Sequence, residues 1–83
     1  MAVFIVMIKE YEDKNKVVYQ YGPNEIILGK IEFNKIHQKI LDLQPVNDPQ
    51  ISNAFYFKRA AQRLAVLSVQ NKEQFPERTT IES

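Results

Sequence analysis

Side chains that commonly carry out enzymatic chemistry are sparse in this sequence. The chain has no cysteine and a single histidine, His37, so thiolate catalysis, disulfides and cysteine-ligated metal sites are excluded. A catalytic triad could combine Ser52, His37 and Asp42. Ser68 is the alternative nucleophile, and neither serine lies in the G-x-S-x-G turn that exposes such a nucleophile. His37 has no second histidine to share a metal ion, and we predict no catalytic residue, no cofactor, no metal site and no enzymatic activity.

Charged residues gather in two places. Glu10, Glu12 and Asp13 are close in sequence, but their spacing does not match a calcium-binding loop, and we predict a charged hairpin tip. The second group, Lys58, Arg59 and Arg63, lies on one side of a predicted helix and is a candidate nucleic-acid contact. The net charge of the whole chain is only +1, which gives little general attraction to nucleic acid or to an anionic membrane.

The length and composition are typical of one small globular domain. Eighty-three residues are enough for a single modest hydrophobic core. The apolar run near the start lacks the flanks of a signal peptide and is far shorter than the roughly 20 residues that span a bilayer. We therefore expect a cytoplasmic protein without a membrane segment.

The longest periodic segment predicts a helix over residues 53–71. Its apolar positions recur with the spacing of one helix face. The residues on this predicted core side are Phe57, Ala60, Ala61, Leu64 and Leu67, with Tyr56 at the margin. Ser52 or Asn53 could cap the helix; alternatively, it begins earlier, with Asp48 as the cap and Pro49 in the first turn.

Three apolar residues project from the opposite side of this predicted helix: Phe55, Val66 and Val69. They are either ordinary exposed side chains or a second apolar stripe that contacts a partner.

Strands are predicted at residues 2–9, 16–21 and 25–33. The first strand is apolar without alternation, so that Phe4 and Val6 point away from Ile5 and Met7, and both of its faces should be covered. One helix covers only one face, and the other requires the chain's own tail or a second molecule.

Three local features leave alternatives. Gly29 inside a strand predicts either a close approach by Ala60 and Ala61 or a β-bulge. Residues 34–43 fit a short helix capped by Asn34 or a turn followed by a strand at 39–43, and we prefer the strand. In the tail, 73–83, residues 79–81 could add to a sheet edge or be frayed.

The order of these segments resembles a group of short, mostly uncharacterised bacterial proteins, some of which look like immunity proteins encoded beside toxins. The similar segments are LGKIEFNK at 28–35, F-x-R-A-A-x-x-L at 57–64 and Phe75-Pro76-Glu77. The resemblance implies a strand meander with a helix and the binding of a protein partner. It supplies no catalytic residues.

The sequence therefore predicts an α+β domain: a three- or four-stranded antiparallel meander with one long C-terminal helix packed on one face. Our functional hypothesis is a noncatalytic protein-interaction module, immunity-like or regulatory, that acts as a homodimer. The candidate partner-binding residues are Phe55, Val66, Val69, Phe4 and Val6. The alternative is a small nucleic-acid-binding protein that uses Lys58, Arg59 and Arg63.

Overall fold

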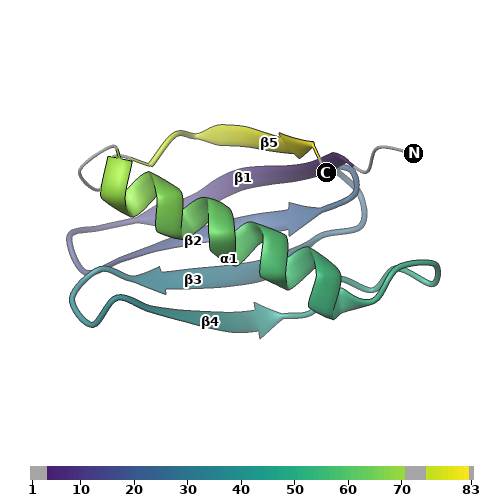
Figure 1. Ribbon diagram of the computed structural model, residues 1–83, viewed down its shortest axis with the longest axis horizontal. Helices are drawn as coiled ribbons and strands as arrows, with labels where there is room; N and C mark the ends of the chain where they lie inside the picture. Colours follow the sequence, from purple (N-terminus) through teal and green to yellow (C-terminus); the bar gives the residue numbers. More distant parts are fainter. Residues whose placement is uncertain (1–3, 71–74, 83) are drawn as a thin grey trace.

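A computed structural model describes residues 4–70 and 75–82 of the chain. They form one antiparallel sheet of five strands, crossed on one face by a single helix (Figure 1). The strands lie in the order β4-β3-β2-β1-β5, and the helix runs diagonally between the two edges of the sheet. The elements are β1 (Phe4–Glu12), β2 (Lys16–Gly22), β3 (Gly29–Asn34), β4 (Lys39–Gln44), α1 (Asn53–Gln70) and β5 (Arg78–Glu82).

The predicted α+β class is confirmed, but the number of strands is five rather than three or four. The additional strand comes from the tail, because residues 78–82 pair with β1 and place Ile81 opposite Ile5. The tail therefore extends an edge of the sheet. It does not cover the face opposite the helix.

The core lies between α1 and the helix-facing side of the sheet. Val17, Tyr19 and Tyr21, at alternate positions of the predicted strand at 16–21, are buried together in β2. They are joined by Ile5, Met7, Ile31, Phe33, Val46, Phe75 and Ile81. Burial of this apolar surface is the main favourable term in the folding of a domain of this size.

The helix is rotated relative to its predicted orientation. Tyr56, expected at the margin, is fully buried beside Ala60 and Leu64, whereas Phe57 and Ala61 are only partly buried at the border of the core. Burying Tyr56 costs little because its hydroxyl donates to Asp48 Oδ2 at 2.6 Å, which satisfies the polar end of an otherwise apolar ring.

Asparagine side chains explain two strand boundaries. Asn24 Oδ1 accepts from the backbone N–H groups of Ile26 and Ile27, each at 2.8 Å, and the resulting turn delays β3 until Gly29 instead of residue 25. Asn34 Oδ1 accepts from the N–H groups of residues 36 and 37. A side chain that bonds in this way competes with regular structure and favours a turn. Residues 35–38 accordingly form a turn, followed by β4, and the helical alternative for 34–43 is wrong.

Gly29 makes a close approach, but not to the helix. A Cβ atom at Gly29 would lie 2.9 Å from Val46 N and 3.0 Å from Pro45 C, and would also meet Gln44 O. The backbone that comes close is the exit from β4, so the predicted contact with Ala60 and Ala61 is wrong. The pairing of β3 with β4 does shift next to Gly29, and the extra residue of that bulge belongs to β4.

The helix begins at Asn53, so the earlier start at Asp48 and Pro49 is wrong. Asp48 instead closes a turn by accepting from Gln50 N at 2.9 Å. The predicted stop at Asn71 lies outside the described residues. Beyond it, Phe75 is buried against Phe33, with ring centroids 5.7 Å apart, and anchors the return of the chain to β5.

Candidate interaction surfaces

We use the term open face for the side of the sheet opposite α1. Its members follow from the cross-strand pairs, because directly opposite residues share a face. Tyr11 lies opposite Val18, Val18 opposite Glu32, and Glu32 opposite Leu41. Phe4, Val6 and Ile8 lie on the same side of β1 as Tyr11, because the extra residue Glu10 shifts the alternation between them. No helix or strand of the described ranges covers this face (Figure 1). The loop between β2 and β3 reaches it at one place, where Glu25 pairs with Arg78, the residue opposite Ile8.

Large apolar side chains on the open face are half-exposed. The exposed fractions are 53% for Phe4, 49% for Tyr11 and 51% for Leu41. Val18 lies between the strands that carry Tyr11 and Leu41 and is only 8% exposed. Tyr11, Val18 and Leu41 lie in one row across the sheet, with Glu32 between Val18 and Leu41, and Phe4 lies at the other end of β1.

The charges on the open face are paired within the chain. Lys30 lies 3.0 Å from Glu10, and Lys16 lies 3.7 Å from Glu32. Lys16 Nζ also lies 5.8 Å from the centre of the Tyr11 ring. The open face therefore carries positive and negative side chains close together, and neither sign of charge predominates.

The candidate partner-binding residues do not come together on one surface. Phe4 and Val6 lie on the open face, whereas Phe55, Val66 and Val69 lie on the helix across the sheet. Phe55 packs against the core and meets the Tyr56 ring edge-on, with centroids 5.7 Å apart. Phe55 therefore contacts its own chain, although the helical periodicity places it on the side opposite the predicted core residues. Val66 and Val69 are 43% and 80% exposed.

The three basic candidates on the helix do not lie together on one surface. Lys58 is exposed, on the far side of the helix from buried Tyr56 and Ala60. Arg59 and Arg63 lie on the β5 side, beside Gln62, Val66 and Ile81. Arg59 stacks over the Phe55 ring at 5.6 Å, and Arg63 donates to Thr80 O at 3.4 Å.

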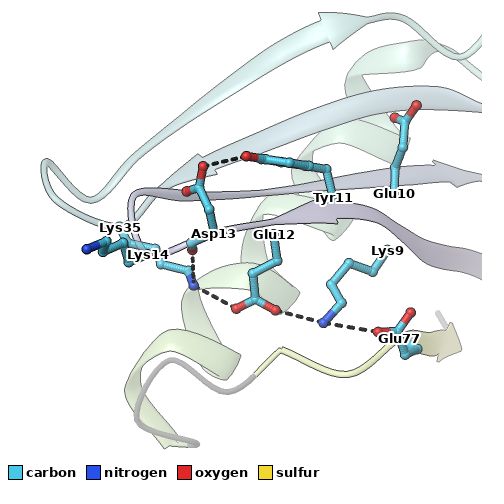
Figure 2. A pocket seen from close by; sticks show the side chains of 8 residues that line it. All are labelled: Lys9, Glu10, Tyr11, Glu12, Asp13, Lys14, Lys35 and Glu77. Atoms are coloured by element: carbon cyan, nitrogen blue, oxygen red, sulfur yellow. Dashed lines mark hydrogen bonds and ion pairs between the residues drawn. The ribbon is translucent and has the colours of Figure 1, made fainter.

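A hollow with a volume of about 480 Å³ lies at the β1–β2 hairpin end and is lined almost entirely by charged side chains (Figure 2). A β-bulge in β1 lies beside it. Lys9 pairs with Tyr19 and Tyr11 pairs with Val18, so Glu10 is the extra residue. This shift places Lys9 and Glu12 on the helix side together, although their spacing in a regular strand would put them on opposite faces.

The charged side chains of this hollow bind one another. Glu12 accepts from Lys9 at 2.7 Å and from Lys35 at 2.6 Å (Figure 2). Lys9 also donates to Phe75 O at 3.0 Å and lies 3.3 Å from Glu77, and Lys35 donates to Asp13 O at 2.8 Å. The chain of ion pairs thus connects the hairpin to the segment that returns from the helix.

The pKa values follow from this geometry. Burial raises the pKa of the Glu12 carboxyl, but the hydrogen bonds and charges of Lys35 and Lys9 lower it by more, so the net shift is downward. The hydrogen bond to Glu12 raises the pKa of Lys9 against the opposing effect of burial. Both groups are therefore charged at neutral pH and saturated by partners, which indicates a structural clamp rather than an acid–base site.

A second polar network fixes the helix N-terminus. Asn53 Oδ1 accepts from Val46 N at 2.7 Å, and Asn53 Nδ2 donates to Asp42 Oδ2 at 2.8 Å. The hydroxyl of Tyr21 lies 2.9 Å from Asp42 Oδ1 and 3.1 Å from Asn53 Oδ1. Asn53 therefore connects α1 to β2 and β4, in addition to starting the helix.

The structure does not assemble the triad considered from the sequence. Asp42 is held by Tyr21 and Asn53, His37 is exposed in the turn before β4, and the hydroxyl of Ser68 donates to Ala65 O at 2.9 Å. Within residues 4–70 and 75–82, no three histidine, cysteine or carboxylate side chains gather closely enough to hold a metal ion.

Sequence reasoning missed two features. The Lys9–Glu12–Lys35 cluster depends on a bulge that has no clear sequence signal. The position of Leu41 on the open face follows from the preferred strand at 39–43, because neighbouring residues of a strand point to opposite faces and Ile40 is the core-facing one.

Comparison with known proteins gives no relative: no protein-family model, curated protein or solved structure matches the chain. The one helix of the described residues is not apolar enough over its length to cross a membrane.

Proposed function

We propose that this protein is a noncatalytic protein-interaction module that forms a homodimer through the open face. The observation that carries the proposal is the half-exposed state of Phe4, Tyr11 and Leu41 on a face that no described helix or strand covers. An exposed apolar area of this kind on a small domain commonly marks an interaction site.

The size of the open face suits a weak dimer. Five strands about 4.8 Å apart and about six residues long at 3.3 Å per residue give a face of about 24 by 20 Å. Two such faces would bury about 1,000 Å² in total, which is the lower limit for a specific interface. We therefore expect dissociation in the micromolar range.

The charge pattern favours a second copy as the occupant. Because Lys30 and Lys16 are already paired with Glu10 and Glu32, the face of one copy meets the same face of another without net repulsion. A two-fold axis requires such self-complementarity. The dimer would then act by binding another protein in an immunity-like or regulatory role, as the resemblance implies, and the absence of cysteine suits a reducing cytoplasm.

Sedimentation equilibrium between about 1 and 200 µM tests the homodimer. We expect a monomer–dimer equilibrium in the wild-type chain and a monomer for Leu41→Lys, because a charge on the open face would be desolvated in the dimer. Val66→Asp is the matched control on the helix and should leave dimerisation unchanged. A wild-type monomer at every concentration would refute the proposal, and loss of the dimer only in Val66→Asp would move the interface to the helix.

A further inference from the structure

A groove separates the helix from the edge strand β5. It has a volume of about 190 Å³ and is lined by Arg59, Gln62, Arg63, Val66 and Ile81. It lies on the helix side of the sheet, so it is distinct from the open face proposed for dimerisation. Its lining combines two cationic groups with two apolar side chains.

The groove runs beside a strand edge whose backbone groups face outward. The N–H of Lys9 donates to Glu77 O at 2.7 Å, so residue 77 directs its backbone groups toward β1. Because these directions alternate in an antiparallel pair, Thr79 and Ile81 also face β1, and Arg78, Thr80 and Glu82 face away. The contact of Arg63 with Thr80 O agrees with this assignment.

The two arginines are available to an anionic partner. Among the described residues, neither Arg59 nor Arg63 forms a salt bridge with a carboxylate. The bond from Arg63 to Thr80 O is 3.4 Å long, longer than the usual 2.7–3.2 Å for such bonds, so a stronger acceptor would displace it at small cost.

The spacing of the arginines matches an extended chain. Residues four apart on a helix lie about 6 Å apart, and residues two apart on a strand lie about 6.6–6.8 Å apart on the same side. A strand added beside β5 would direct every second side chain toward α1, on the side where Ile81 is buried. These side chains would lie on the same side of the sheet as Arg59 and Arg63.

We propose that this groove binds an extended, acidic segment of a partner protein, which adds to β5 as a sixth strand and pairs two carboxylates with Arg59 and Arg63. Main-chain bonds to residues 78, 80 and 82 supply affinity, and the arginines select for acidic residues at alternate positions. The inference rests on the proposed role as a protein-interaction module but does not depend on the homodimer.

The test is an NMR titration of the ¹⁵N-labelled full chain with the peptide acetyl-TVEVEVT-amide. The Leu41→Lys variant serves as the host if the wild type is dimeric, so that peptide binding and dimerisation are read separately. We expect amide shifts at Thr80, Glu82 and residues 59–66. The same peptide with glutamine for glutamate should bind about tenfold more weakly, since each of two exposed ion pairs contributes about threefold.

Matched variants locate the contacts. Arg59→Gln and Arg63→Gln should each weaken binding about threefold, whereas Lys58→Gln removes the same charge from the same helix and should not. A peptide N-methylated at alternate residues, on the edge that faces β5, should not bind, because it cannot donate to the strand. Absence of shifts, equal binding of the glutamine peptide, or shifts centred on β4 would each overturn the proposal. If oligo-dT shifted the amide signals of the groove residues and the peptide did not, the proposal would be overturned in favour of a nucleic-acid ligand.

Discussion

Replacement of Glu12 by glutamine tests whether the ion-pair chain holds the return segment to the hairpin. Glu12 is 23% exposed and binds two lysine side chains that are 15% and 9% exposed. Removing one partner of a fully buried pair costs about 3–5 kcal/mol, and exposed pairs are worth about 0–1 kcal/mol. Lys9 and Lys35 each keep a carbonyl acceptor, so we expect an intermediate loss of about 2 kcal/mol.

Glu10→Gln is the matched control. Glu10 lies on the same strand and pairs with Lys30, but both side chains are more than one-third exposed, so its loss should cost at most about 0.5 kcal/mol. Urea unfolding followed by far-UV circular dichroism at one protein concentration measures both variants. With a slope of about 1–1.5 kcal/mol per molar urea for a chain of this size, Glu12→Gln should lower the midpoint by roughly 1.5 M.

The pH dependence separates charge from packing. Because the pKa of Glu12 is lowered in the folded state, its contribution is present above the unfolded pKa of about 4.3 and is lost as the pH falls through the folded value. The difference between the wild type and Glu12→Gln should therefore begin to narrow as the pH falls below about 4.3 and should continue to shrink at lower pH. Equal midpoints for Glu12→Gln and Glu10→Gln at pH 7, or a difference that is undiminished at pH 3, would refute the clamp.

Three further predictions concern the core. Burial, followed by its bond to Asp48, raises the pKa of Tyr56 to about 12. The difference in absorbance at 295 nm between the wild type and Tyr56→Phe should therefore show this tyrosine neutral at pH 11, and its ionisation at the pH of free tyrosine would contradict the structure. Since the unfolded pKa is about 10, stability falls as the pH rises above 10. Gly29→Ala should destabilise the fold by about 2 kcal/mol or more by urea unfolding, since its Cβ would lie 2.9 Å from Val46 N; an unchanged midpoint would mean that the exit of β4 moves freely. Asn53→Ala should lower the free energy of unfolding by about 2 kcal/mol in the same assay, because it leaves the Val46 N–H without its acceptor. Ser52→Ala should lower it by less than about 0.5 kcal/mol. If Ser52→Ala were the more destabilising of the two, Ser52 would be the helix cap.

Local patterns in the sequence were sufficient for the main elements. Alternation of Val17, Tyr19 and Tyr21 predicts a half-buried strand, and the recurrence of Ala60, Leu64 and Leu67 predicts a helix over the same core. Both rest on the geometric periods of strand and helix, which require no knowledge of distant residues. Ile81 in the tail also lies on a strand, which is one of the two alternatives predicted for residues 79–81.

Side-chain bonding to the backbone accounts for the boundaries that were misplaced. Asn24 delays β3 by closing a turn, and Asp48 closes another turn where a helix start was considered. Asparagine and aspartate favour caps and turns alike, and the choice between them depends on the path of the following chain.

Residue types and short-range periods are enough to predict the α+β class, the two-sided apolar character of the first strand and the absence of thiol chemistry. Contacts between distant parts of the chain are needed to show that the tail adds beside β1 and not across the open face, that the exit of β4 approaches Gly29, and that a bulge at Glu10 brings Lys9 and Glu12 together. These outcomes depend on strand register and on contacts between residues far apart in sequence. A one-residue shift in register moves a side chain to the other face of the sheet, and a periodic pattern does not specify such a shift.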